Sequence, residues 1–177
     1  MAAMESNAPA PSESLVRNKN TSQFVGFRLA EQEYAFRIEQ IQEIVIPRQV
    51  TCAPQVPSYV EGVSNLRGTI IPIINLRGLF GLEARPADEN TRTIVVNVGE
   101  RTMGCTVDAV TQVIRIPVEL IQPAPDVIST ERTAYVTGFA RIDDRILVIL
   151  DIDQLLEPDK LDQVQQAAVH RTAMPEL

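Results

Sequence analysis

The chain of 177 residues has little of what most catalytic and nucleic-acid-binding sites are built from. It contains one histidine, two cysteines and no tryptophan, and aromatic residues make up 5% of it. The single histidine, His170, lies in a polar C-terminal stretch, where no packed neighbours would hold a catalytic imidazole in place. There is no glycine-rich phosphate loop and no serine in a Gly-x-Ser-x-Gly context. We therefore expect neither catalysis nor a bound cofactor.

Two pairs of neighbouring carboxylates are the remaining candidates for acid–base chemistry. Asp143 is adjacent to Asp144, and Asp151 is two residues from Asp153. Paired carboxylates can serve as general acid and general base. The first pair lies in an expected turn, however, and Asp151 already has a role as the N-cap of a short helix. An acid–base hydrolase that uses Asp143 and Asp144 is kept as the enzyme alternative, and loss of turnover in Asp144→Asn would support it.

Charge and hydropathy exclude two further classes of partner. The net charge is −7, from 16 Lys and Arg against 23 Asp and Glu, whereas a nucleic-acid site needs clustered basic residues. No apolar run approaches the ~18 residues of a membrane span. The N-terminal stretch has no apolar signal core, and Cys52 and Cys105 lack a metal-ligand spacing. We expect a cytoplasmic protein with reduced thiols, no metal and no membrane insertion.

The sequence contains one long pattern twice. Residues 59–80 (YVEGVSNLRGTIIPIINLRGLF) align with residues 135–156 (YVTGFARIDDRILVILDIDQLL) at an offset of 135 − 59 = 76. Upstream, residues 24–44 align with residues 93–113 at an offset of 93 − 24 = 69. Aromatic, glycine and Asn/Asp positions match along with the apolar ones, which indicates an internal duplication. Each copy alone would be marginally stable, so we expect the two to pack together.

Alternating apolar residues predict several short strands and little helix. Strands are expected at 25–29, 34–38, 93–98, 103–107 and 110–116, fully buried apolar strands at 70–74 and 146–150, and short helices capped by Asn75 and Asp151. This pattern predicts an all-β fold with minor α, made of two small β-barrels in tandem. The expected organisation is a flexible tail over 1–22, a domain over 23–157 and a helix or tail over 158–177. Within the domain, the repeats of about 23–82 and 92–157 could exchange strands.

Arg67 is the residue that a duplicated fold does not explain by itself. It sits in a turn between apolar segments, and its duplicate position is Asp143. One interpretation is a solvated turn arginine. The other is an arginine at the mouth of a cleft between the halves, available to a carboxylate or backbone group of a partner.

Several motifs resemble the CheW family of bacterial chemotaxis coupling proteins. They are NLRGTIIPII at 65–74, IQEI at 41–44, Gly99, and YVTG at 135–138, and the likeness covers about residues 22–157. Asn75 departs from the usual Asp of the family, but both residues cap helices. The resemblance implies two SH3-like five-stranded β-barrels in pseudo-twofold relation. It also implies a non-catalytic adaptor that joins the cytoplasmic tips of chemoreceptors to the regulatory domain of the histidine kinase CheA.

The resemblance further implies where partners bind. Ile41, Glu43, Gly62 and Arg67 would lie in or near the receptor-binding region, Gly138 is a further candidate for partner contact, and apolar surfaces at the barrel ends would meet the kinase. An apolar cleft between the barrels is expected to take the helical receptor tip. The protein would then be associated with receptor arrays at the inner membrane face. The alternative is an adaptor on the same fold in a chemosensory-like pathway that controls pili, surface attachment or a second messenger.

Overall fold

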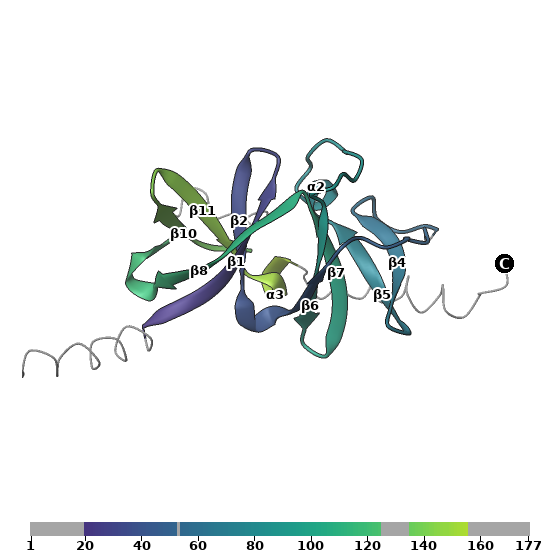
Figure 1. Ribbon diagram of the computed structural model, residues 1–177, viewed down its shortest axis with the longest axis horizontal. Coiled ribbons are helices and arrows are strands. Elements are labelled where there is room, and N and C mark those ends of the chain that lie inside the picture. The colour runs from purple at the N-terminus through teal and green to yellow at the C-terminus, as the bar shows by residue number, and fades with distance from the viewer. Residues whose placement is uncertain (1–19, 53, 125–134, 156–177) are drawn as a thin grey trace, which may run out of the picture.

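Two β-sheets make up most of the structure, a computed structural model that describes residues 20–52, 54–124 and 135–155 (Figure 1). The six-stranded sheet has the order β8-β1-β2-β11-β10-β9, and the five-stranded sheet has the order β3-β6-β7-β5-β4. The strands are β1 (Thr21–Leu29), β2 (Gln32–Arg37), β3 (Ile41–Val45), β4 (Val60–Leu66), β5 (Thr69–Asn75), β6 (Arg92–Val98), β7 (Arg101–Val107), β8 (Ala109–Pro117), β9 (Ile121–Pro123), β10 (Val136–Ile142) and β11 (Arg145–Leu150).

Each sheet combines strands from both copies of the repeated pattern. The β1–β2 hairpin belongs to the first copy, but it pairs with β8 and β11 of the second. The β6–β7 hairpin of the second copy pairs in the same way with β3 and β5 of the first. The chain therefore crosses between the sheets twice, through the 3₁₀ turn Ile38–Gln40 after β2 and again between β7 and β8.

The hydrogen-bonding registers of the two sheets repeat at the offsets of the sequence pattern. In the parallel pairs, Ile74 lies opposite Cys105 and Leu150 lies opposite Phe36. Bulges recur at matching places, between Val60 and Gly62 in β4 and between Val136 and Gly138 in β10. The mostly β, two-part architecture expected from the sequence is therefore confirmed. One sheet has six strands and not the expected five. Strand β9 is the additional strand, and its counterpart in the five-stranded sheet is only the single bridge between Thr51 and Val63.

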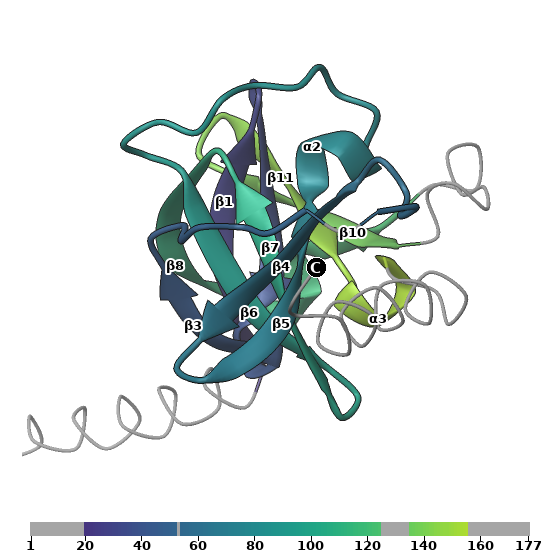
Figure 2. The same ribbon diagram turned by 90° about the vertical axis from the view of Figure 1, so that its right-hand side faces the viewer.

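Connections between edge strands force both sheets to curl. Strands β8 and β9 lie at opposite edges of the six-stranded sheet, yet only Val118–Leu120 joins them. Three residues span about 10 Å at most, so the two edges must approach each other. In the five-stranded sheet, the chain beyond edge strand β3 reaches edge strand β4, where Thr51 and Val63 exchange backbone hydrogen bonds of 2.8 and 2.9 Å. Figure 2 views the molecule from this side, with β3, β4 and β5 toward the viewer.

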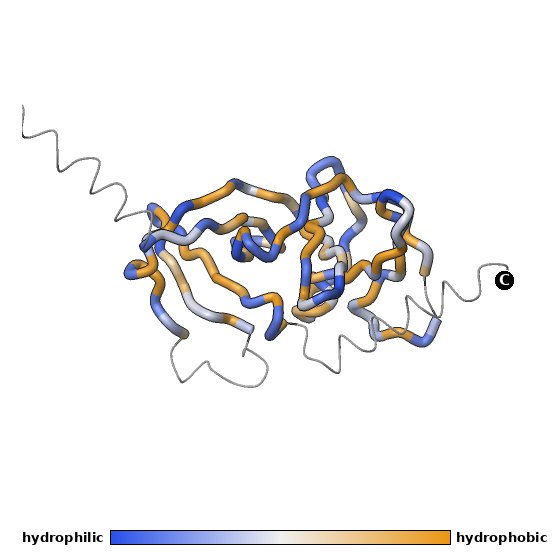
Figure 3. Tube along the Cα trace, turned by 90° about the horizontal axis from the view of Figure 1, so that it is seen from below, coloured by the Kyte–Doolittle hydropathy of each residue, from blue (hydrophilic) through white to orange (hydrophobic). Residues whose placement is uncertain are grey.

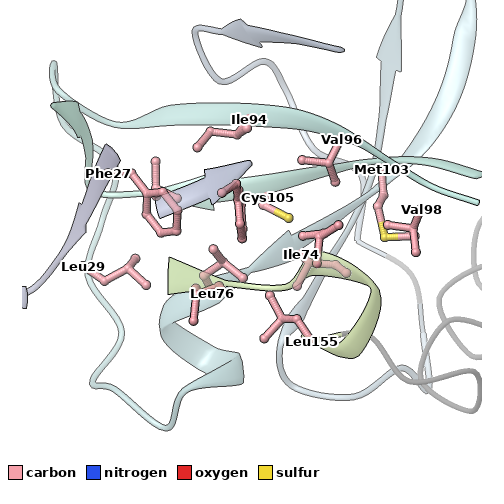
Figure 4. Packing of buried hydrophobic residues seen from close by; sticks show 14 of the residues in the cluster. Phe27, Leu29, Ile74, Leu76, Ile94, Val96, Val98, Met103, Cys105 and Leu155 are labelled. Carbon is pink, nitrogen blue, oxygen red and sulfur yellow. The ribbon is translucent and has the colours of Figure 1, made fainter. Parts of the chain in front are cut away.

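A large apolar cluster fills the space between the two sheets (Figure 4). The six-stranded sheet contributes Phe27 and Phe36, and the five-stranded sheet contributes Ile74, Ile94 and Cys105. The seam between the halves is thus a packed core around these residues, and side chains fill the place where an apolar cleft for a receptor tip was expected. Burial raises the pKa of the Cys105 thiol to about 12, which agrees with the core role expected for it. Figure 3 shows hydrophobic residues concentrated along the strands and hydrophilic ones at turns and loops.

The two short helices begin as the sequence predicts. Asn75 Oδ1 accepts a hydrogen bond of 3.0 Å from Arg77 N at the start of α2 (Leu76–Leu79). Asp151 Oδ1 accepts one of 2.9 Å from Asp153 N at the start of α3 (Ile152–Leu155). Both caps satisfy backbone donors that a helix start leaves free.

The ion pair of Arg77 and Asp108 lies where the chain crosses between the two sheets. Asp108, between β7 and β8, accepts hydrogen bonds of 2.8 Å from Arg77 Nε and Arg77 Nη2 of α2. Its Oδ2 also accepts one of 2.8 Å from the backbone N–H of Ala30, in the β1–β2 turn. The Arg77 and Asp108 side chains are only 12% and 14% exposed. The pair therefore ties the six-stranded sheet to α2.

Two expectations for the ends of the domain can be placed. The first strand begins at Thr21, two residues before the expected start of order. The expected tails fall almost entirely on residues 1–19 and 156–177, which lie outside the described residues. Within the described part, no helix is long and apolar enough to cross a membrane.

Candidate partner-binding surface

Arg67 occupies an unusual backbone position at the tip of the β4–β5 hairpin. Arg67 has φ +53° and Gly68 has φ +88°, as in the type I′ turns that join strands by two residues. Asn65 Oδ1 accepts a hydrogen bond of 2.7 Å from Gly68 N and holds the turn. A positive φ is disfavoured for an arginine. The counterpart Asp143 also has a positive φ, +56°, so both halves share this backbone geometry but not the side chain.

The Arg67 side chain reaches across the open side of the sheet to Glu43. Its Nη1 donates to Glu43 Oε2, and the two side chains are 69% and 19% exposed. The hydrogen bond to Glu43 and then its charge raise the pKa of the Arg67 guanidinium. Because β3 and β4 are the two edges of the sheet, this pair joins opposite edges. Arg67 is thus a solvent-facing turn arginine that is paired with Glu43 of the same chain.

The other half of the molecule has no equivalent ion pair. The positions that correspond to Glu43 and Arg67 are Gln112 and Asp143. The six-stranded sheet nevertheless forms the equivalent hairpin, β10–β11, and its edge strand β9 pairs with β10 as the segment at Thr51 pairs with β4. The charge pair is therefore not a requirement of the shared fold.

Gly62 and Gly138 are placed by the structure at points of close backbone approach. Gly62 has φ +144°, and a Cβ built there would lie 2.0 Å from the carbonyl oxygen of Thr51. At Gly138, a Cβ would lie 2.6 Å from the carbonyl oxygen of Gln122. Both glycines are buried at the bulges where the edge segment crosses β4 or β10. These contacts account for both glycines, and a role in partner binding stays a prediction for each.

Ile41 lies between core and surface. It begins β3, pairs with Val96 and packs partly buried against the central cluster. Ile41 and Glu43 thus lie on one strand with Glu43 near the surface. The structure brings Glu43 and Arg67 together, while Gly138 belongs to the other sheet.

Exposed aliphatic side chains lie close in sequence to the charge pair, and sequence reasoning missed them. Ile44, Ile46 and Ile70 are 38%, 69% and 41% exposed. The segments 70–74 and 146–150 were expected to be fully buried, but Ile70 and Ile146 both face solvent, because each lies beside an exposed hairpin tip. On the six-stranded half, Val113, Val118, Leu120 and Ile146 are 52–57% exposed. Ile70 and Ile146 occupy equivalent repeat positions, a signal that the sequence did contain.

The carboxylate pairs do not form a catalytic site. Asp143 and Asp144 lie in the exposed β10–β11 turn, and Asp151 serves as the cap of α3. Within the described ranges, no group of three or more His, Cys, Asp and Glu side chains is placed to hold a metal ion.

Comparison with known proteins identifies the family. Residues 23–160 match the model of the CheW-like domain. The chain belongs to the CheW-like family. It is 40% identical to the chemotaxis protein CheW of Klebsiella aerogenes over 146 residues, 82% of this chain and 88% of that one. The CheW of Helicobacter pylori is 38% identical over 142 residues, which cover 80% and 86% of the two chains.

A solved CheW structure has the same fold. The crystal structure of the scaffolding protein TtCheW from Thermoanaerobacter tengcongensis superimposes with a TM-score of 0.72 at 37% identity, covering 78% of this chain and 94% of that one. CheW-like proteins are scaffolds and not enzymes, in agreement with the non-catalytic character expected from the sequence. The CheW-like domain here thus presents an exposed charge pair and exposed isoleucines on a scaffold fold.

Proposed function

We propose that this CheW-like protein is a cytoplasmic adaptor that couples the tips of chemoreceptors to the histidine kinase CheA in chemotaxis signalling. Its similarity to proteins named chemotaxis protein CheW, over 86–88% of their length, carries the proposal. Such a protein acts by binding two partners at once. A weak contact, with micromolar Kd and about −8 kcal/mol, suffices where many copies assemble together.

The five-stranded half offers the surface for the receptor. Arg67 holds an exposed guanidinium at the tip of a rigid turn, and Glu43 lies beside it. Ile44, which follows Glu43 in β3, and Ile70, near the start of β5, add exposed apolar area. A fixed arginine with apolar neighbours is a combination enriched at protein interfaces. We assign this surface to the receptor tip, with Ile41 supporting it from within.

The six-stranded half offers a second, less charged surface for the kinase. Val113, Leu120 and Ile146 are each 57% exposed there. Burial of such side chains against an apolar patch of a partner is favourable by roughly 25 cal/mol per Å² of area removed from water. Separate surfaces allow both partners to bind at the same time, which coupling requires.

The test uses Arg67→Glu with a matched control. The substitution should weaken capture of a receptor fragment and leave kinase binding and the unfolding midpoint nearly unchanged. Arg28→Glu makes the same charge change at an exposed position of the six-stranded sheet and should leave receptor capture intact. Conversely, Ile146→Asp should weaken capture of the kinase regulatory domain. If Arg67→Glu binds receptor as the unaltered protein does, the assignment of this surface is wrong.

A charge swap separates partner contact from a role within the fold. Glu43→Arg with Arg67→Glu restores the ion pair across the sheet edges with its polarity reversed. If the pair acts only by closing the sheet, the swap should recover receptor binding. If Arg67 contacts the receptor directly, the swap should bind as poorly as Arg67→Glu alone, and this is the result we expect.

A further inference from the structure

The interiors of the two barrels are filled to different extents, although their backbones correspond. The six-stranded barrel is packed by Phe24, Ala35, Ile116, Ala140, Leu147 and Ile149. The equivalent positions of the five-stranded barrel hold Thr93, Gly104, Pro47, Ser64, Ile71 and Ile73. A benzyl group is thus replaced by a threonine side chain, and a methyl group by hydrogen. The five-stranded barrel consequently contains a cavity of about 230 Å³.

One wall of this cavity is aliphatic and another carries hydroxyl groups. Val45, Val50 and Ile73 line the aliphatic wall, and Val95 lies fully buried beside them. Ser64, Thr91 and Thr93 also line the cavity and are 9%, 7% and 5% exposed. Buried hydroxyl groups need hydrogen-bond partners. A wall of this kind suits a ligand that has both an apolar and a polar part.

Most charged side chains at the cavity already have partners. Asp108 pairs with Arg77 at 2.8 Å and with Arg85 at 3.6 Å, and Arg85 pairs with Asp88 at 3.1 Å. These four groups balance one another. They form the rim next to α2 and the loop that follows it.

Two lining charges of opposite sign are left over. Glu61 and Arg48 line the same cavity and take part in none of the ion pairs found among the described residues. Burial raises the pKa of the Glu61 carboxyl, and a hydrogen bond with Thr106 opposes that rise. A half-buried carboxylate that takes part in no ion pair among the described residues is an attractive site for an ammonium group. Arg48, exposed at the rim, can accept a carboxylate in the same way.

We propose that the cavity of the five-stranded barrel binds a small zwitterion with an aliphatic side chain, of the kind of L-leucine. Glu61 holds the ammonium group, Arg48 holds the carboxylate, and the aliphatic wall takes the side chain. The volume is below the about 300–1,000 Å³ of sites for drug-sized ligands, so the ligand is compact. This site is separate from the receptor surface proposed above and its test does not depend on that proposal.

The test is a calorimetric titration of the full-length protein with three probes. They are L-leucine, 3-methylbutylamine, which lacks the carboxylate, and 4-methylpentanoate, which lacks the amine. Leucine should bind saturably and about tenfold or more tightly than either analogue, because each lacks one charge-assisted contact. The absence of saturable leucine binding overturns the proposal. Binding of 4-methylpentanoate as tight as that of leucine also overturns it, since it would indicate an apolar cavity only.

Variants locate the site. Glu61→Gln should weaken leucine about tenfold or more, whereas Glu100→Gln, in an exposed turn, should have no effect. Thr93→Phe copies Phe24 into the cavity and should abolish binding. Should that variant fail to fold, Val45→Ile with Val50→Ile, which copies Ile114 and Ile121, fills the same space more gently and should weaken binding. Leucine affinity that is unchanged in Glu61→Gln contradicts the assignment.

Discussion

Replacement of Asp108 by asparagine should destabilise the fold more than any exposed charge removal. The carboxylate receives two hydrogen bonds from the Arg77 guanidinium and one from the backbone N–H of Ala30. Asparagine keeps one carbonyl oxygen and loses the charge. The Arg77 side chain, which is only 12% exposed, would then keep one of its two oxygen acceptors at position 108 and lose the other. The link between α2 and the β1–β2 turn would be weakened with it.

The expected loss is about 2–3 kcal/mol at neutral pH. A hydrogen bond to a charged group contributes about 1.5–3 kcal/mol, and loss of one partner from a fully buried ion pair is destabilising by about 3–5 kcal/mol. Because the Arg77–Asp108 pair keeps some solvent contact, we expect a loss below that of a fully buried ion pair and within the range of a charged hydrogen bond. Urea unfolding followed by circular dichroism measures it as a lower midpoint at unchanged slope. Asp144→Asn, at an exposed turn, is the control and should stay within about 0.5 kcal/mol of the unaltered protein.

The difference in unfolding free energy between the unaltered protein and Asp108→Asn should depend on pH. Burial alone would raise the pKa of Asp108, but the hydrogen bonds from Arg77 and Ala30 and the charges of Arg77 and Arg85 outweigh it and hold the pKa below its usual value. A carboxyl with a depressed pKa in the folded state stabilises the fold above its unfolded pKa, and this contribution is lost as the pH falls through the folded pKa. The gap to Asp108→Asn should therefore narrow in acid. Equal midpoints at neutral pH, or a gap that does not change with pH, would refute this reasoning.

Three further outcomes follow from the packing. Gly62→Ala should be destabilising by several kcal/mol, because its Cβ would lie 2.0 Å from a carbonyl oxygen, whereas Gly68→Ala meets no atom within 4 Å and should lose only about 1 kcal/mol from its positive φ; melting temperatures would check the order. In the native protein at mildly alkaline pH, a thiol reagent should label Cys52 and not Cys105, since Cys52 is exposed and Cys105 is buried with a pKa of about 12. Glu61→Gln should raise the urea midpoint at neutral pH, because a carboxyl whose pKa is raised by burial destabilises the fold once it ionises, and this gain should vanish in acid.

Local features of the fold were predictable because the signals for them are local. Alternating apolar residues located the β1–β2 and β6–β7 hairpins, and the polar residue that follows each buried apolar run located the helix caps at Asn75 and Asp151. The turn at Arg67 and Gly68 followed from glycine between two apolar runs. Each of these depends on a few neighbouring residues.

The pairing of distant strands was beyond the sequence pattern. Strand β2 pairs with β11 over a separation of more than 100 residues, and periodicity does not encode partners at that distance. The short strand β9 was also missed, because three residues with a proline give no alternation. The exposed Ile70 and Ile146 went unrecognised, since a continuous apolar run does not indicate where solvent begins. The contact between Glu43 and Arg67 needed the curled sheet, which brings its two edges together.

The duplication allows each half to serve as a reference for the other. Positions that the backbone requires hold similar residues in both halves, as Gly62 and Gly138 do at the bulges and Asn75 and Asp151 do at the caps. The turn position of Arg67 and Asp143 is different, since its positive φ is shared but its side chain is not.

The same comparison separates the charge pair and the cavity from what folding demands. The six-stranded half folds with Gln112 where the five-stranded half has Glu43, and with Phe24 where it has Thr93. Neither the ion pair nor the cavity is therefore needed to build this barrel. The two unlike partners of the proposed function require halves that differ, because symmetric surfaces would bind the same partner twice. Substitutions at the Arg67–Glu43 pair of the five-stranded half should therefore alter binding before they alter stability.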